Sequence, residues 1–404
     1  MGAAMTRSSS TTTTETPASD GFPRELLVQP PAERLAYFAA KVVAHPRLVD
    51  AHRAVHDALR QPTAPSLIVL YGPTGVGKTT LRLRLEQQLI TEALPALEKD
   101  AARVPVLAVE AIAPESGQFN WKDYYARALV ALNEPLLDRK VIVNAAVNPD
   151  ALRPTIRRSA SAPALRWVLE QCLRQRRVGV CLIDEAQHLK RLASGRRLLD
   201  QMDTLKSLAA TTGTMHVLVG TYELLGLTNL SAQLSRRSVE VHFGRYRASV
   251  DKDRLAFKSV LLTFQRHLPV SEEPDLVGLW ERLYEGSLGC VGVLKSWLNR
   301  ALADAIAREA TTITRRHLDR QALPTRTLLN LAREITEGEA VLREDPKGRD
   351  QLRSLLGLPA TSITQTRSEL NLTRQATGDR TSRPRRTGRV ARRPTRDVVA
   401  MEVG

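Results

Sequence analysis

The chain has 404 residues, of which 43% are hydrophobic, so it is long enough for two or three domains and a sizeable core. Its formal net charge is +16, which favours a polyanionic partner such as nucleic acid. No apolar run is long enough to span a membrane, no signal peptide is visible, and Cys172, Cys181 and Cys290 lack metal-ligand spacing. We therefore expect a soluble protein of the reducing cytoplasm, with no membrane partner.

Changes in composition divide the chain into four parts. Residues 1–22 are rich in Ser and Thr and predict a disordered tail. Residues 23–248 alternate helical periodicity with short apolar runs, which predicts an α/β domain with a parallel sheet covered by helices on both faces. Strand signals then stop, so residues 249–357 predict a smaller, all-α lid domain with further C-terminal helices. Residues 358–404 predict a flexible, Arg-rich tail.

The predicted elements alternate along the first domain. Helices within residues 23–60 precede a strand that ends at Gly72, and a helix follows just after Lys78, over residues 81–89. Further strands are predicted at 104–110, 178–183, 216–220 and 239–243, with helices between them at 121–132, 162–174 and 198–209. In the second domain the predicted helices are 254–266, 275–284, 294–307, 316–322 and 325–341.

The stretch between the first strand and its following helix carries a phosphate-binding pattern. It reads Gly72-Pro73-Thr74-Gly75-Val76-Gly77-Lys78-Thr79, followed by Thr80, with the spacing Gly-x-x-x-x-Gly-Lys-Thr. Its glycines let successive backbone N–H groups point at a phosphate, and the helix N-terminus adds partial positive charge. Lys78 is expected to reach the β- and γ-phosphates, and the Thr79 hydroxyl to hold Mg²⁺. The stretch predicts binding of ATP with Mg²⁺, and the helices within residues 23–60 are expected to pack beside the nucleotide.

Asp184 and Glu185 close the apolar run 178–183. A carboxylate at the C-terminal tip of a buried parallel strand lies where open α/β sheets bind their ligands. Asp184 is expected to hold Mg²⁺ through its water shell, and Glu185 to orient or deprotonate the attacking water. Two solvated acids at the start of a loop are the alternative, which the upstream phosphate loop disfavours. A helicase is also conceivable from the run 184–188, but no other helicase block is evident.

Two further positions qualify as site residues. Thr221 ends the strand predicted at 216–220, where its hydroxyl could bond the γ-phosphate or the lytic water and so report the nucleotide state. Arg236 and Arg237 precede the strand predicted at 239–243, a point from which an arginine of a ring-forming ATPase commonly reaches the neighbouring subunit's γ-phosphate. A solvated helix C-terminus explains the two arginines equally well, and the sequence does not choose between them.

Together these elements resemble the AAA+ ATPases, and more closely the TnsC/TniB family of transposition regulators, relatives of the phage Mu B protein. The similarity runs from about residue 34 to residue 356. It is carried by residues 51–59, the phosphate loop, 119–125, 131–136, 182–189 and 218–222. Only the Phe-x-Trp block that begins at Phe119, with its spacing, points to this subfamily.

The resemblance implies a slow, regulatory ATPase that turns ATP and water into ADP and phosphate. In that family the protein binds double-stranded DNA without sequence preference and assembles on it as a homo-oligomer, in rings or helical filaments. It links a target-selection protein, TniQ-like or the CRISPR effector of a CRISPR-associated transposon, to the transposase subunits, and ATP hydrolysis drives disassembly. These partners and the disassembly step are implied by the resemblance alone.

The resemblance also assigns positions. Gly72, Gly75, Gly77, Lys78, Thr79 and Thr80 fall on the phosphate-binding positions, Asp184 and Glu185 on the acidic motif, and Thr221 on the first sensor. One departure concerns the Gly-x-x-Arg that opens a lid helix in many AAA+ proteins. Here it reads Gly289-Cys-Val-Gly292, so Gly stands at the Arg position and Lys295, one turn on, is the nearest substitute. The sequence therefore does not decide whether the lid senses the γ-phosphate.

Contact with DNA should be electrostatic and largely independent of base sequence. The candidate residues are Lys122 and, in the basic segment 138–160, Arg153, Arg157 and Arg158, each of which an ordinary solvated charge explains as well. The Arg-rich tail binds DNA, docks on a transposase subunit, or serves only solubility.

Two other AAA+ functions and one other class of enzyme are alternatives. A secretion-associated AAA protein should carry a membrane span or a peptidoglycan-binding module, and neither is visible in the sequence. A replication initiator should carry a winged helix after the lid, where residues 325 onward show no β-hairpin signal. A small-molecule kinase keeps the phosphate loop but does not need the acidic pair and a strand-end sensor.

Overall fold

The computed structural model describes residues 21–61, 67–113, 119–132, 161–190, 196–228, 238–343 and 346–359. The contacts between residues divide the chain into two units, Met1–Val341 and Leu342–Gly404. In the second unit the described element is helix α15 (Pro346–Leu355). All other described elements belong to the first unit.

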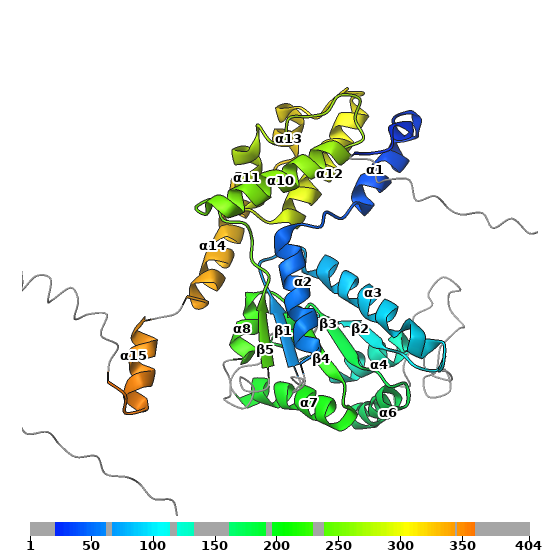
Figure 1. Ribbon diagram of the computed structural model, residues 1–404, viewed down its shortest axis with the longest axis vertical. Helices are drawn as coiled ribbons and strands as arrows, with labels where there is room; N and C mark the ends of the chain where they lie inside the picture. Colours follow the sequence, from blue (N-terminus) through cyan, green and yellow to red (C-terminus); the bar gives the residue numbers. More distant parts are fainter. Residues whose placement is uncertain are drawn as a thin grey trace, which may run out of the picture. The chain divides into compact units, whose positions relative to one another are not determined.

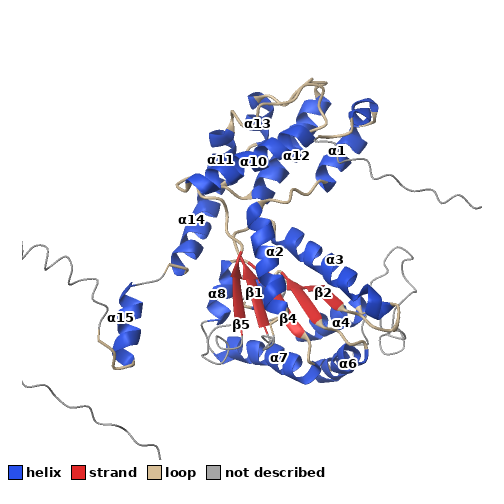
Figure 2. Ribbon diagram, viewed as in Figure 1, coloured by secondary structure: helices blue, strands red, loops and turns tan. Residues whose placement is uncertain are grey.

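Five parallel strands form the sheet of the first unit, drawn in red in Figure 2. The strands are β1 (Leu67–Tyr71), β2 (Val106–Glu110), β3 (Val180–Asp184), β4 (Met215–Gly220) and β5 (Ser238–His242), in the order β2-β3-β4-β1-β5. Every residue of β1 and β3 is buried, as expected of unbroken apolar runs in a parallel sheet. Since β1 and β3 both lie beside β4, their C-terminal ends meet at one edge of the sheet.

Helices cover both faces of the sheet (Figure 1). On one face, α2 (Pro46–Leu59) and α3 (Lys78–Leu97) pack over alternate strand residues such as Ile68 and Leu182. On the other lie α4 (Trp121–Ala131), α6 (Ala162–Gln175) and α7 (Arg196–Thr212), where the Tyr124 hydroxyl lies 3.8 Å from the buried Cys181 sulfur. The predicted α/β fold with both faces covered is confirmed.

In the described residues after β5 the regular elements are helices, as predicted. They are α10 (Asp251–His267), α11 (Trp280–Ser287), α12 (Val291–Ala307), α13 (Arg315–Gln321) and α14 (Thr325–Val341). Their core includes Phe257 and Trp297 and also takes in Phe38 of the N-terminal helix α1 (Pro31–Ala40). The lid core is therefore built from both ends of this unit, which spacing along the chain does not show.

Two predicted helices have different boundaries in the structure. The helix predicted at 275–284 begins only at Trp280, because the side-chain oxygen of Gln265 on α10 accepts hydrogen bonds from the backbone N–H groups of Leu276 and Val277. Helix α3 begins at Lys78 itself and extends past the predicted end at residue 89, through Pro95, to Leu97.

Short helical turns complete the described structure: η1 (Arg24–Val28), η2 (Ala186–Leu189), η3 (Tyr222–Leu224) and α8 (Leu225–Thr228). The three cysteines are buried, as expected of small apolar side chains. None of the helices in the described ranges combines the length and apolar character that crossing a bilayer requires.

Candidate nucleotide-binding site

The phosphate loop connects β1 to α3 and closes around its own lysine. Gly75 and Gly77 have φ values of +76° and +114°, a region that glycine adopts without steric cost. Lys78 is the first residue of α3, and its ammonium donates to the carbonyl oxygens of Gly72 at 3.0 Å and Pro73 at 2.9 Å. The sequence pattern thus folds into the strand–loop–helix arrangement that it predicts.

The Lys78 ammonium is buried beside carboxylates. Only 9% of the residue is exposed. Burial lowers the pKa of Lys78, and the nearby charges of Glu185, Asp184 and Glu334 act in the opposite direction. A buried cation whose hydrogen bonds go to neutral carbonyls is poorly compensated, so an anion bound in the loop gains from it.

Asp184 lies at the end of β3 with both carboxylate oxygens occupied by donors. Its Oδ1 accepts from the Glu185 backbone N–H at 3.0 Å, and its Oδ2 accepts from the Arg82 guanidinium at 3.2 Å. Arg82 stands one turn after Lys78 on α3 and also pairs with Glu86 at 2.6 Å. Arg82 is not recognisable as a site residue from the sequence, because an arginine on an amphipathic helix carries no signal of its partner on a strand 102 residues away.

Glu185 and Thr221 are brought together by a third residue. Glu185 has a left-handed backbone, with φ 52° and ψ 32°. Gln187, on η2, donates from its side-chain amide to the Glu185 carboxylate and accepts from the Thr221 backbone N–H at 3.3 Å. The Thr221 hydroxyl itself accepts from the Glu223 N–H at 3.4 Å and so caps η3.

The strand ends place these groups at the mouth of the phosphate loop. The Gly72 N–H donates to the Gly220 carbonyl at 3.3 Å, so the start of the loop lies directly against the residue before Thr221. Lys78, Asp184, Glu185 and Thr221 therefore share one edge of the sheet. This is the edge where ligands of open α/β sheets bind.

Thr79 and Asp184 fit a magnesium ion that arrives with a nucleotide. A hydroxyl and a carboxylate supply hard oxygen ligands, and Mg²⁺ in such sites keeps several waters and takes phosphate oxygens for the rest. Thr79 is exposed at the start of α3, whereas Asp184 is buried. The described ranges contain no cluster of three or more His, Cys, Asp or Glu that would hold a resident metal.

The lid contacts the loop through glycine. The Val293 N–H at the start of α12 donates to the Gly75 carbonyl at 3.1 Å. A Cβ atom built on Gly292 would lie 2.5 Å from that same oxygen, closer than real contacts allow. Glycine at the position where many AAA+ lids carry arginine thus has a steric reason, since α12 packs directly on the loop backbone.

Lys295 lines a small cavity beside the loop, but the hydrogen bonds of its ammonium go to α1. Its ammonium donates to the carbonyl oxygen of Ala39 at 2.6 Å and to that of Lys41, at the C-terminal end of α1. Burial lowers the pKa of Lys295. In this structure its charge caps α1, where a cation is favoured by the helix dipole.

Arg245, just after β5, is a cation near the loop that the sequence analysis missed. It forms a bidentate ion pair with Glu339 of α14, in which Nε donates to Oε1 at 2.9 Å and Nη2 donates to Oε2 at 3.1 Å. Each of the two side chains is 17% exposed. Burial raises the pKa of the Cys290 thiol to about 12, and the Arg245 and Lys78 charges oppose that rise. Glu334 of α14 also accepts from Thr74 of the loop at 3.4 Å.

A small cavity of about 60 Å³ adjoins the loop where the predicted N-terminal helices meet it. Its walls are mostly apolar and include Val43, His45, Val76, Thr80 and Val291. His45 caps α2 by accepting from the Leu48 N–H. Burial, followed by the Arg84 charge, lowers the pKa of His45 to about 4, so the imidazole that lines the cavity is neutral at pH 7.

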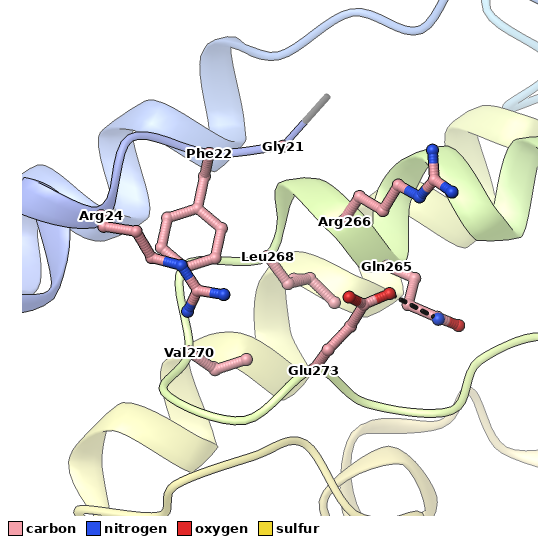
Figure 3. A pocket seen from close by; sticks show the side chains of 8 residues that line it. All are labelled: Gly21, Phe22, Arg24, Gln265, Arg266, Leu268, Val270 and Glu273. Carbon is pink, nitrogen blue, oxygen red and sulfur yellow. Dashed lines mark hydrogen bonds between the residues drawn. The ribbon is translucent and has the colours of Figure 1, made fainter. Parts of the chain in front are cut away.

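A larger cavity, of about 420 Å³, lies between the N-terminal segment and the end of α10 (Figure 3). The Arg24 guanidinium stacks over the Phe22 ring at 5.2 Å, and the Gln265 amide donates to Glu273 at 2.7 Å. No residue of the phosphate loop or of the acidic strand lines this cavity. It is therefore separate from the candidate nucleotide site.

Several predicted residues stand apart from this site. Lys122 lies in the first turn of α4 and is half-buried. The remaining candidates lie outside the described residues: Arg153, Arg157, Arg158, Arg236 and Arg237.

The fold and the site together have the strand–loop–helix arrangement of a P-loop domain. The phosphate loop follows β1, the acidic pair follows β3 and Thr221 follows β4 of a parallel sheet ordered β2-β3-β4-β1-β5. Residues 61–228 match the family described as AAA domain. AAA domains in general bind and hydrolyse nucleotides. Among curated proteins the comparison found no match.

Solved structures with a similar fold include three at 14% sequence identity. The ORC2 protein of Aeropyrum pernix, in ADPNP and ADP complexes, has a TM-score of 0.48, over 83% of this chain and 88% of that one. Cdc6p of Pyrobaculum aerophilum has a TM-score of 0.46, over 84% and 89%. Domain III of the Thermotoga maritima replication initiation protein DnaA has a TM-score of 0.37, over 70% and 94%. At these values the similarities carry no inference about function.

Proposed function

We propose that this protein is an ATPase that converts ATP and water to ADP and phosphate in a slow, regulatory reaction. The observation that carries the proposal is the meeting of Lys78, Asp184 and Glu185 at one edge of the sheet, against a loop whose glycines present backbone N–H groups. Phosphoryl transfer needs mainly positioning and charge stabilisation, and this edge offers both.

Each residue has a distinct part in the reaction. Lys78 exchanges its loop carbonyls for β- and γ-phosphate oxygens, assisted by loop N–H groups and the N-terminus of α3. Glu185, held by Gln187, orients the attacking water and accepts its proton. Thr79 and Asp184 would hold Mg²⁺, which neutralises phosphate charge when it is bound.

The base of the nucleotide is proposed to lie against the cavity beside Thr80. Apolar side chains, among them Val43 from the N-terminal segment and Val291 from the lid, line this cavity, and its volume of about 60 Å³ takes one edge of a base. Because α12 and the segment before α2 both line it, a base there would contact the sheet domain and the lid together. Binding of ATP is therefore expected to stabilise the contact between the lid and the loop.

We further propose that the ATPase is a regulator of transposition that oligomerises on double-stranded DNA and links target selection to the transposase. The support is the resemblance of the sequence to the TnsC/TniB family and a net charge of +16, which suits sequence-independent binding to DNA phosphates. Arg236 or Arg237 would complete a neighbouring subunit's site. A secretion-associated or initiator-type AAA+ protein would share the site but not this mode of assembly.

Sedimentation with and without ATP and duplex DNA of arbitrary sequence tests both parts. The wild type should form fast-sedimenting polymers only when both are present. Lys78→Ala, which removes the phosphate-binding ammonium, should lose nucleotide binding and assembly together. Glu185→Gln should bind ATP but stop hydrolysis, and so trap the polymer. Lack of affinity for ATP would refute the first proposal, and equal coating of DNA without ATP would refute the second.

A further inference from the structure

Gln187 is a buried side chain with two partners in the candidate site. The residue is 8% exposed and lies on η2, two positions after Glu185. Its amide nitrogen donates to a Glu185 carboxylate oxygen, while its amide oxygen accepts from the Thr221 backbone N–H at 3.3 Å. One carboxamide therefore joins the end of β3 to the end of β4.

The surrounding backbone makes room for this carboxamide. A Cβ atom on Gly220, the last residue of β4, would lie 2.4 Å from the Gln187 amide oxygen. Any larger residue at 220 would therefore displace the side chain. Glu185 in turn adopts a left-handed backbone at φ 52°, which is unfavourable for a residue with a side chain and persists only where contacts hold it.

The donor and the acceptor ends have different consequences. A hydrogen bond to an ionised carboxylate is stronger than one between neutral groups, so the amide fixes one oxygen of Glu185 and leaves the other for a water molecule. The acceptor end holds a backbone N–H, so substitution of the Thr221 side chain leaves that bond in place. A displacement of the end of β4 would therefore also displace the Gln187 carboxamide and, with it, the Glu185 carboxylate.

We infer that Gln187 is a positioning residue that holds the Glu185 carboxylate in place for hydrolysis and connects it to the C-terminal end of β4. The inference rests on the proposed ATPase function, because it assigns a part in that reaction. Gln187 contacts Glu185 and the Thr221 backbone, and acts through Glu185. It is distinct from Thr221, whose hydroxyl caps η3.

A double-mutant cycle between Gln187 and Glu185 tests the inference. Gln187→Ala should lower kcat for ATP about 10- to 100-fold, the factor expected for losing one charge-assisted hydrogen bond, with KM within about threefold of wild type. In the Glu185→Gln background the same substitution should change the residual single-turnover rate by less than about twofold, because residues that act as a unit are not additive.

Gln187→Glu separates positioning from a structural role. It keeps the size of the side chain and the acceptor for the Thr221 N–H, but it cannot donate to Glu185 and repels it. Its kcat should fall at least as far as that of Gln187→Ala. The two neighbouring carboxylates should also lower the free energy of unfolding, so kcat is measured well below the unfolding transition of the variant. The matched control is His188→Ala on the same turn. Within the described residues, the buried His188 Nδ1 has no hydrogen-bond partner, so its loss should leave kcat within about twofold.

The outcomes distinguish the two proposals. If the wild type hydrolyses ATP and Gln187→Glu retains a kcat within about twofold of it, the positioning role is refuted while the ATPase stands. The same holds if Gln187→Ala lowers the rate by equal factors with and without Glu185. If the wild type hydrolyses no ATP, the proposed function fails, and the positioning role fails with it.

Discussion

Gly292→Ala should destabilise the contact between the lid and the phosphate loop. The added Cβ would lie 2.5 Å from the Gly75 carbonyl oxygen and 3.2 Å from its carbon. An unstrained contact needs about 3.4 Å, so the first turn of α12 must move away by roughly 1 Å. That movement lengthens the Val293 N–H bond to the same oxygen, now 3.1 Å, beyond hydrogen-bonding distance.

The magnitude follows from three contributions. Loss of the hydrogen bond costs about 0.5–1.5 kcal/mol, and strain from overpacking costs about 1–3 kcal/mol. Replacing glycine by alanine inside a helix returns about 0.5–1 kcal/mol. The free energy of unfolding should therefore fall by about 0.5–4 kcal/mol, which lowers Tm by several degrees for a domain of this size.

Chemical denaturation and a nucleotide-binding titration measure the effect. The matched control is Gly226→Ala on α8, where the new Cβ would meet only the flexible end of the Lys190 side chain. The control should stay within about 0.5 kcal/mol of wild type. If Gly292→Ala unfolds like the control and binds ATP with unchanged affinity, the close packing of α12 on the loop is wrong.

Two further predictions concern buried charge and pH. Glu339→Ala leaves Arg245 half-buried without its ion-pair partner and should lower the free energy of unfolding by about 1–3 kcal/mol. The control Glu337→Ala, at an exposed position on the same helix, should change it by less than about 0.5 kcal/mol. Equal effects of the two variants in chemical denaturation would contradict the ion pair. His45 has a pKa of about 4 when folded, against 6.5 when unfolded, so its neutral form stabilises the fold above pH 6.5. This contribution to the free energy of unfolding, up to about 3 kcal/mol, should be lost as pH falls from 6.5 to 4. In His45→Asn, which can still cap α2, the free energy of unfolding should fall less steeply over the same pH range. Equal slopes for the variant and the wild type would refute the role of His45.

Local pattern predicted the parts of the site that lie on consecutive residues. The phosphate loop was visible because its glycines, lysine and threonine occupy fixed spacings between an apolar run and a helix. Asp184 and Glu185 were visible because they end a strand that is buried along its whole length. In a parallel sheet these positions must meet at one edge, so the sequence was sufficient to bring them together.

Partners contributed by distant segments were not predictable in the same way. Arg82 and Asp184 are 102 positions apart, Arg245 and Glu339 are 94, and the contact between Thr74 and Glu334 spans 260. An arginine or a glutamate on a helix face looks the same whether it meets solvent or a buried partner. The partner becomes known only from the folded structure, in which α3 lies beside β3 and α14 reaches Thr74 and Arg245.

Gly292 departs from the AAA+ lid motif, and the reason becomes clear only from the residue that it contacts in the structure. In the sequence it appears as a missing arginine, and Lys295 appears as its nearest substitute. In the structure Gly292 is one half of a backbone contact with Gly75, and Lys295 caps α1. A side chain at 292 would hold the lid away from the loop, so placing an arginine there would disrupt the contact before its charge could reach a phosphate. The close approach of α12 to the loop requires glycine at position 292 and therefore excludes an arginine there.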